Sequence, residues 1–235
     1  MKTMRLNLLI RILVVLLVFT SAYSQEELKS SATDSISNFN FLYNKARQKS
    51  VSWSLSYQLP MTTGNNYIGQ GYDGEYGFVF KTKVFVYKQL YVGYAYNHSV
   101  FDVEDTSVIG NFNSSRATAH TFNFGYEFLP LNKVKLGINY GFGSVRFRNK
   151  IGGDFEFSDT GDLQVLSFYL TYEVSKNISV FSEYGFNKVN SDISTPDSLN
   201  NFFEKGRFNT LNFGILIALG NDDVISAVKK TYGMQ

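Results

Sequence analysis

The chain has 235 residues and no cysteine; charged residues make up only 18% of it and aromatic residues 17%. A chain without cysteine has neither a disulfide framework nor a lipid-modified N-terminal cysteine. The charged fraction lies below the roughly 25% typical of soluble domains, and this balance suits a protein with a lipid-facing surface. The 22 basic and 20 acidic residues nearly cancel, so no basic field indicates a nucleic-acid partner.

The first 24 residues have the pattern of a secretory signal peptide. Lys2, Arg5 and Arg11 precede an apolar run over residues 12–19, and small residues follow at Ala22 and Ser24, before a cleavage point. An uncleaved membrane anchor is the alternative, but the run is shorter than the about 20 residues that a membrane helix needs. We therefore expect export and removal of residues 1–24.

Apolar and polar residues then alternate with a period of two, which predicts β-strands. Eight strands are expected, at about residues 51–59, 75–87, 90–101, 117–129, 134–148, 163–174, 178–190 and 207–219. In the fifth strand the alternation changes parity near Gly143 and Ser144, which predicts a β-bulge there. The clearest hairpin spans residues 163–190, and its arms of ten to twelve residues exceed the about five or six of an ordinary strand. Arms of this length suit strands that cross a membrane.

Short helices are expected at both ends of the strand region. The polar segment 25–48 contains apolar residues at helix-like spacing, namely Ile36, Phe39, Tyr43 and Ala46. The tail after residue 220 has Asp222 or Asp223 near the start of a small helix and Lys229 and Lys230 near its end, as the helix dipole prefers.

The connections between the strands alternate in length. Short turns are expected at about 88–89, 130–133 and 175–177, and long polar loops at about 61–74, 102–116, 149–162 and 191–206. Long external loops and short periplasmic turns are the topology of a membrane barrel. We therefore predict an all-β fold, an eight-stranded antiparallel up-and-down transmembrane β-barrel.

Alternation alone does not say which face of the barrel is inside. A soluble barrel of lipocalin type would turn the apolar face inward. Here the polar face is dominated by Gly, Ser, Asn and Thr, which suits a narrow filled interior, whereas a water-facing exterior would be richer in charge. The apolar face also carries more Phe and Tyr than one small barrel could enclose. We therefore expect the apolar face to point toward lipid.

The strand pattern resembles the small eight-stranded outer-membrane barrels of the OmpX and OmpA-barrel type, in the form common in the Bacteroidota, where Tyr-rich strands carry phrases like TYEVSKNISVFSEYGF. The resemblance covers about residues 49–220. It implies a signal peptide at 1–24, a polar periplasmic segment at 25–48, the barrel at 49–220 and a periplasmic tail at 221–235. It also implies the cell outer membrane as location, with lipid and lipopolysaccharide around the barrel.

The eighth strand resembles the C-terminal assembly signal of such barrels, which the barrel-assembly machinery recognises. The residues that match this signal are Asn212, Gly214, Ile217 and Leu219. The strand departs from the pattern in two ways: its closing residue is leucine where an aromatic residue is usual, and a tail follows it.

Six ionisable residues fall on the polar parity of the strands and are expected inside the barrel: Lys81, Lys83, Glu127, Lys135, Glu173 and Glu183. Charges in such an interior are costly unless paired, so we predict a network of ion pairs that fills the lumen and prevents conduction. A gated ion path through these residues is the alternative.

His98 and His120 flank the second long loop and are expected as neighbours on the outward face, near Asp102 and Glu104. Plain interfacial histidines are the preferred interpretation, with a metal site as the alternative. The acidic residues of the loop at 149–162, Asp154, Glu156, Asp159 and Asp162, lack the EF-hand spacing, so a solvated loop is preferred over a calcium site.

An enzyme is not expected. Outer-membrane lipid A deacylases place a histidine two residues before a serine on one strand, but His98 and Ser99 are adjacent and face opposite sides. No cofactor is indicated. We expect a monomeric barrel that acts through its long loops in adhesion, partner binding or envelope integrity. A small porin-like channel, a lipid-modifying enzyme and a soluble lipocalin-like binder are the alternatives.

Overall fold

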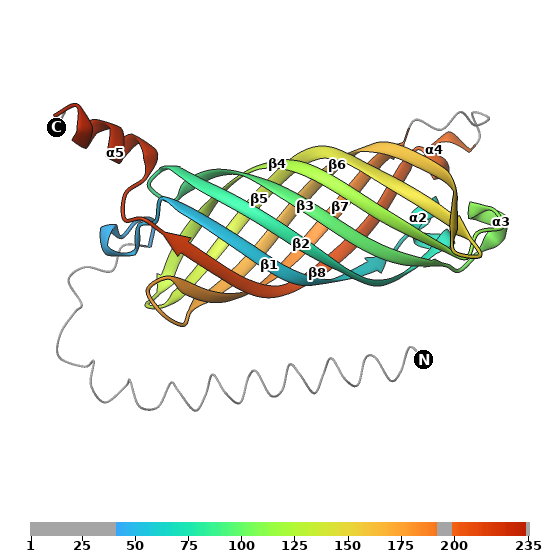
Figure 1. Ribbon diagram of the computed structural model, residues 1–235, viewed down its shortest axis with the longest axis horizontal. Coiled ribbons are helices and arrows are strands. Elements are labelled where there is room, and N and C mark those ends of the chain that lie inside the picture. The colour runs from blue at the N-terminus through green and yellow to red at the C-terminus, as the bar shows by residue number, and fades with distance from the viewer. Residues whose placement is uncertain (1–40, 192–198, 234–235) are drawn as a thin grey trace. The chain divides into compact units, whose positions relative to one another are not determined.

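The computed structural model describes residues 41–191 and 199–233. Its strands follow one another around a closed barrel, each antiparallel to its neighbours, and β1 pairs with β8 to close it (Figure 1). The strands are β1 (Val51–Thr62), β2 (Tyr72–Tyr87), β3 (Leu90–Val103), β4 (Ser114–Leu131), β5 (Val134–Ile151), β6 (Asp154–Glu173), β7 (Ile178–Ser191) and β8 (Lys205–Leu219). The predicted all-β, eight-stranded, up-and-down barrel is therefore confirmed.

The two ends of the barrel differ in their connections. At the turn end, short turns join β2 to β3, β4 to β5 and β6 to β7. The opposite loop end carries α2 (Tyr67–Gly71), α3 (Thr106–Ile109) and α4 (Asn200–Phe203) (Figure 1). In the described part of the chain, no helix is long and apolar enough to cross a bilayer.

The chain enters and leaves the barrel at the turn end. The 3-10 helix η1 (Lys45–Arg47) precedes β1, and α5 (Val224–Thr231) follows β8. Asp223 caps α5 by accepting a hydrogen bond from the Ser226 backbone N–H at 2.8 Å, so the C-terminal helix is confirmed. The predicted signal peptide, together with Ile36 and Phe39, lies outside the described residues.

The predicted long loop at 149–162 is wrong. β5 and β6 continue as a paired hairpin to Ile151 and Asp154, joined only by Gly152 and Gly153. Both glycines have positive φ, 58° and 104°, as tight two-residue hairpin turns require. The charges and glycines of this stretch suggested a loop, but charged side chains on a strand face water as readily as those of a loop.

The apolar face of the barrel points outward. Leu55 is 60% exposed and Phe122 63%. The interior is polar over the same stretch, with Ser52, Ser54, Ser56 and Gln58 of β1 all buried. Large exposed apolar side chains that continue around the outside of a barrel indicate a face that contacts lipid or a partner. We call it the apolar belt; it takes in outward side chains such as Leu55 on β1, Phe80 on β2, Phe122 on β4, Phe142 on β5, Phe168 on β6, Phe186 on β7 and Ile215 on β8. The lipocalin-type arrangement, with apolar residues inside, is thus wrong.

The predicted bulge at Gly143 and Ser144 is also wrong. β4 and β5 pair without interruption there, with Thr121 opposite Gly143 and His120 opposite Ser144. What changes is the chemistry of the two faces. Beyond this point the inward residues are Val145 and Phe147, each 2% exposed, and the outward ones include Arg146. The strand leaves the belt, so water replaces lipid outside and an apolar core replaces polar groups inside.

Candidate functional site: the closed lumen

The structure brings all six predicted ionisable residues onto the inner wall of the barrel. Glu127 lies 3.2 Å from Lys83 and 3.3 Å from Lys135, and Lys135 lies 3.3 Å from Glu173. Lys81 and Glu183 form a separate ion pair, and the Asn212 side chain donates to Glu183 at 3.4 Å. Since every charge has an opposite charge in contact, the ion pairs offset much of the desolvation cost that the interior imposes.

Two tyrosines inside the lumen extend this network. The Tyr169 hydroxyl donates to Glu127 at 3.1 Å and lies 3.2 Å from the Tyr91 hydroxyl. The Lys83 ammonium lies 3.9 Å from the Tyr169 ring centre and 4.5 Å from that of Tyr91, within cation–π range. Sequence reasoning missed both tyrosines, although they share the parity of the lumen lysines and glycines.

Each tyrosine ring lies over a glycine of the neighbouring strand. Tyr91 is directly opposite Gly125, and Tyr169 directly opposite Gly137. A Cβ atom at Gly137 would stand 1.9 Å from the Tyr169 ring, and one at Gly125 2.4 Å from the Tyr91 hydroxyl. Because the two glycines have no side chain, they leave the space that the tyrosine rings occupy. This position of the rings holds the Tyr169 hydroxyl against Glu127 and the Tyr91 hydroxyl against Asn139.

The segment 45–49 crosses the opening at the turn end. Arg47 pairs with Glu173 at 3.0 Å and donates to the carbonyls of Leu131 and Val134 at 2.8 and 3.0 Å. Gln48 is 1% exposed and donates to the Lys88 carbonyl at 2.8 Å. The Lys49 ammonium donates to Asn177 at 3.0 Å.

Residues 45–49, which we call the plug, therefore contact all three turns. Arg47 joins the ion-pair network from the turn end of the barrel. Burial, with a smaller effect of the nearby cations Lys135 and Lys176, lowers the pKa of Lys49. The sequence offered one signal for this plug, namely basic and amide residues immediately before β1.

The loop end is closed by an apolar core. Tyr67 and Ile68 of α2 are 5% and 0% exposed and join Phe101, Phe147 and Phe208 from the barrel wall. The Phe101 ring packs edge-on against Phe208 with centroids 5.8 Å apart. The Tyr67 hydroxyl lies 2.7 Å from Ser191, and burial raises the pKa of Tyr67 to about 12.

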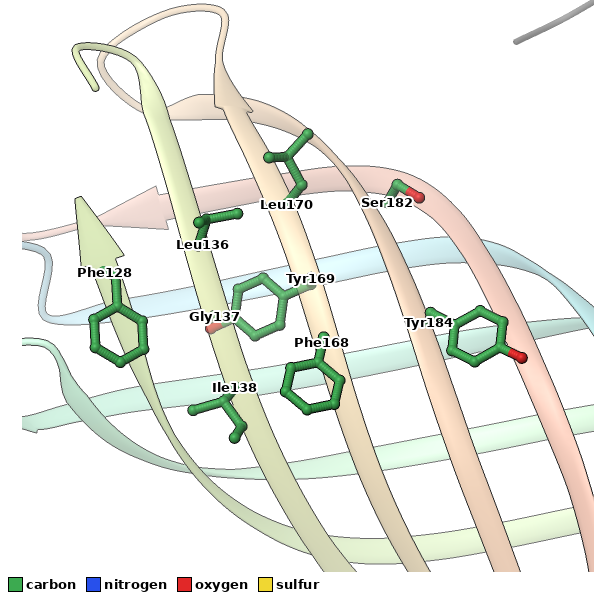
Figure 2. A pocket seen from close by; sticks show the side chains of 9 residues that line it. All are labelled: Phe128, Leu136, Gly137, Ile138, Phe168, Tyr169, Leu170, Ser182 and Tyr184. Atoms are coloured by element: carbon green, nitrogen blue, oxygen red, sulfur yellow. The ribbon is translucent and has the colours of Figure 1, made fainter. Parts of the chain in front are cut away.

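A small cavity lies inside the barrel between these layers. The cavity beside Lys81, Glu183 and Asn123 has a volume of about 30 Å³, room for about two water molecules. A larger hollow of about 560 Å³ lies on the outer wall, where Leu136, Ile138, Phe168 and Leu170 surround the bare backbone of Gly137 (Figure 2). Its lining side chains are apolar apart from Ser182 and the two tyrosines Tyr169 and Tyr184, so its shape and polarity suit an acyl chain.

The two histidines face outward but are not directly opposite. His98 pairs with Thr118 and His120 with Tyr96, so they are diagonal neighbours. His120 contacts the Tyr94 hydroxyl, and His98 lies 3.4 Å from that of Thr118. In residues 41–191 and 199–233 no group of three ligating side chains could hold a metal ion. Ser99 is buried on the opposite face and bonds Gln58 at 2.6 Å.

The acidic residues of the former loop are spread along β6. Asp154 lies at the tip of the hairpin, where it pairs with Ile151, and Asp162 pairs with Ser144 near the belt. Asp159 is half-buried on the inward side and Asp162 is exposed on the outward side. These carboxylates therefore do not converge on one point.

The residues of the predicted assembly signal lie on the closing strand. Asn212 is buried in the lumen, while Ile217 and Leu219 are 47% and 40% exposed on the outer face. Gly214 is directly opposite Ser56 of β1, and a Cβ there would lie 2.3 Å from the Leu55 carbonyl oxygen. These residues thus lie at the seam at which β8 meets β1; whether they act as a signal stays a prediction.

No protein-family model and no curated protein matches the chain. Several solved structures match it in fold. Neisserial surface protein A matches with a TM-score of 0.50 at 14% identity, over 71% of this chain and 94% of that one. Ail of Yersinia pestis matches at 0.44 and 14% over 73% and 100%, and OprG of Pseudomonas aeruginosa at 0.40 and 10% over 75% and 99%. The chain has the fold of the small eight-stranded outer-membrane β-barrels.

Proposed function

We propose that this protein is a monomeric outer-membrane β-barrel that does not conduct and that acts through its loop end. Residues 1–24 direct export, the barrel-assembly machinery reads the β8 seam, and the turn end faces the periplasm. The orientation rests on the short turns and on both chain ends leaving the barrel at that side. The apolar belt supports the membrane placement.

The observation that carries the proposal is the closure of the lumen at three levels. An apolar core fills the loop end, ion pairs and tyrosines fill the middle, and residues 45–49 cover the turn end. A hydrated ion needs a continuous water-filled path, whereas the cavity beside Lys81 and Glu183 has a volume of about 30 Å³, room for about two waters.

Planar-bilayer recordings test this closure. Purified protein is expected to give no steady conductance. The Arg47→Ala variant removes the cation that ties residues 45–49 to the β4–β5 turn and to Glu173 at the end of β6. It is also expected to stay silent, because the apolar core at the loop end remains. Steady channels in the wild type would contradict the closed lumen. Channels in Arg47→Ala alone would show that the plug, rather than the core, closes it.

The β5–β6 hairpin supports a role for the loop end in adhesion or partner binding. Residues 154–160 of β6 pair only with β5; pairing with β7 begins at Gly161. In the described part of the chain, this edge therefore has unpaired backbone groups, the kind of surface to which another strand can add. Phe155 and Phe157 on it are 41% and 55% exposed.

The membrane placement and the loop-end role have separate tests. Outer-membrane fractionation with a heat-dependent gel shift tests the barrel, and a soluble periplasmic protein without a shift would refute it.

Adherence of a non-adherent host that expresses the wild type is then compared with that of the same host expressing a Phe157→Ser variant. Equal adherence with equal surface amounts would remove the hairpin from the function and leave envelope integrity, measured as detergent sensitivity of a deletion strain.

A further inference from the structure

The tail that follows β8 forms α5 and carries an apolar stripe that no other part of the described chain covers. The stripe consists of Val224, Ile225 and Val228 of α5 and of Tyr232 just after it, which are 39 to 73% exposed. Their spacing places all four on one side of a helix. A surface helix ordinarily turns such a side toward a core, but the core clusters among the described residues include none of them.

The start of α5 is attached to the turn end of the barrel (Figure 1). Asp223 is fully buried and accepts hydrogen bonds from the backbone N–H and the hydroxyl of Ser226, each at 2.8 Å. Asp222 forms an ion pair with Lys45, and its carbonyl oxygen accepts a hydrogen bond from the Ser50 hydroxyl. At about 100° per residue, Ser226 lies roughly opposite the middle of the stripe. The stripe therefore points away from these contacts.

The attachment fixes the depth at which α5 begins. Asp223 is hydrogen-bonded to the backbone of Lys88, which lies between Tyr87 and Leu90 at the turn-end edge of the apolar belt; their side chains are 45 and 43% exposed. At a rise of about 3.3 Å per residue and a tilt of about 45°, one or two residues place the helix start roughly 2 to 5 Å beyond the belt. The headgroup layer extends about 5 to 8 Å beyond the hydrocarbon, so α5 begins inside it.

Two cations of α5 lie within reach of the same layer. Lys229 and Lys230 in the last turn are exposed, and neither takes part in an ion pair among the described side chains. Lys229 lies five residues after Val224, about 7.5 Å along the helix axis, and a lysine side chain spans about 6 Å. Even from a helix that points straight away from the membrane, the Lys229 ammonium therefore reaches back to about 7 Å from the belt, the depth of headgroups.

The charge of the whole turn end favours an anionic surface as the partner of α5. Each of the three short turns contains a lysine, namely Lys88, Lys133 and Lys176. A second copy of the helix would add like charges to this end, whereas an anionic surface supplies counter-charge to the turns and to α5 together. Figure 1 shows α5 running obliquely past the outline of the barrel, so its far end lies over the surrounding leaflet and not over the lumen.

We propose that α5 binds the inner leaflet, with its apolar stripe at the boundary of the acyl chains and Lys229 and Lys230 on the phosphate groups of an anionic phospholipid. This inference rests on the proposed outer-membrane location and orientation. Amphipathic helices with lysine beside an apolar side bind membrane surfaces in this way, and each lysine near an anionic surface strengthens binding about fivefold. The stripe thus continues the apolar belt past the end of the sheet.

The position of the stripe is tested with nitroxide labels in the full-length protein. The chain has no cysteine, so Val228→Cys gives a single label on the stripe, and Ala227→Cys gives one about 100° around the helix from it. In vesicles of phosphatidylcholine and phosphatidylglycerol, the label at position 228 is expected to collide with oxygen, which concentrates in lipid, and to be shielded from a water-soluble nickel complex. The label at position 227 is expected to be open to the nickel complex.

Charge removal gives the size of the effect. The double variant Lys229→Gln/Lys230→Gln, labelled at position 228, is expected to bind the leaflet about fivefold more weakly for each lysine lost, measured from the bound and free components of the spectrum. Lys150→Gln/Lys205→Gln, with the same charge change at the loop end, is the matched control and should bind as the wild type does. Vesicles of phosphatidylcholine alone should weaken the binding of the wild type.

Three outcomes would overturn the inference: equal access of the nickel complex to both labels, equal binding in the two kinds of vesicle, or shielding of position 228 from oxygen and nickel alike, which would mean that protein covers the stripe. If Val228→Cys does not give the heat-dependent gel shift, Val224→Cys replaces it. A shifted band with a water-exposed stripe refutes the role of α5 alone, whereas loss of that band from the outer-membrane fraction of the wild type refutes the proposed function.

Discussion

Replacing Gly137 by alanine is expected to destabilise the barrel by about 3 kcal/mol, far more than one methyl group ordinarily does. The Cβ atom would stand 1.9 Å from Cζ of Tyr169 and 2.3 and 2.4 Å from two further ring atoms. The ring must therefore leave its place. Its hydroxyl then loses Glu127 and Tyr91, and the Lys83 ammonium loses the ring it lies against.

The magnitude follows from the contacts that are lost. A hydrogen bond to a charged acceptor contributes about 1.5 to 3 kcal/mol, and a desolvated cation–π contact up to about 2 kcal/mol. Alanine restricts the unfolded chain more than glycine does, which offsets about 0.4 to 1 kcal/mol. The balance is a loss of about 2 to 4 kcal/mol.

Urea unfolding in lipid vesicles, monitored by Trp53, measures this loss. Gly185→Ala is the matched control: it also faces the lumen, but the nearest atom to its Cβ is the rotatable Thr210 hydroxyl at 2.6 Å, with the next atoms at 3.8 Å. Tyr169→Phe removes the hydroxyl but keeps the ring, and the double variant with Gly137→Ala should cost less than the two single losses added together. A Gly137→Ala variant within about 0.5 kcal/mol of the Gly185→Ala control would refute the proposed fit of ring and glycine.

Three further variants probe the other layers. Glu127→Gln leaves Lys83 and Lys135 without their shared carboxylate and should lower the free energy of unfolding by about 3 to 5 kcal/mol; a loss below 1 kcal/mol would mean that water already solvates both lysines. The Lys45 hydrogen bond lowers the pKa of Asp222, so the contact contributes stability above the carboxyl's ordinary pKa and is lost as the pH falls through the lowered value; hydrogen exchange at residues 45–49 should rise below about pH 4, and Asp222→Asn should remove that dependence. Burial raises the pKa of Tyr67 to about 12, so its contribution is complete below about pH 10 and is lost as the pH rises to about 12; the wild type should lose about 3 kcal/mol more than Tyr67→Phe over that interval, and parallel curves would contradict the burial of this hydroxyl.

The alternation of residue types was enough to predict the strands and the face on which each side chain lies. It placed Lys81 and Glu183 on the same inner wall although they are far apart in the chain, because parity in a closed barrel decides inside from outside. It could not give the contacts within that wall. Which lysine meets which carboxylate depends on the stagger between strands, and a period of two carries no information on stagger.

The errors concern β5 and β6 beyond the belt. Arg146 and Arg148 on the outward parity, with Val145 and Phe147 on the inward one, were interpreted as a slip in the pattern at Gly143 and Ser144. β5 keeps its register with both neighbours from these two residues as far as Asn149, and only its surroundings change; the register shift against β6 falls between Asn149 and Lys150. A rule that assigns apolar residues to one face assumes one solvent along the whole strand, and this strand passes from lipid to water.

The same passage accounts for the two kinds of interior. At the level of the apolar belt, the lipid outside the barrel is as apolar as any side chain, so burying apolar groups in the lumen gains little free energy. There, specific hydrogen bonds and ion pairs such as Glu127 with Lys83 hold the barrel wall together. Beyond the belt, water outside restores the hydrophobic driving force, and Phe101, Phe147 and Phe208 form a core like that of a soluble barrel. Variants of the ionic layer should therefore weaken the membrane half while the loop end stays closed. The loop-end surface would then keep its shape even where the lumen beneath it has been altered.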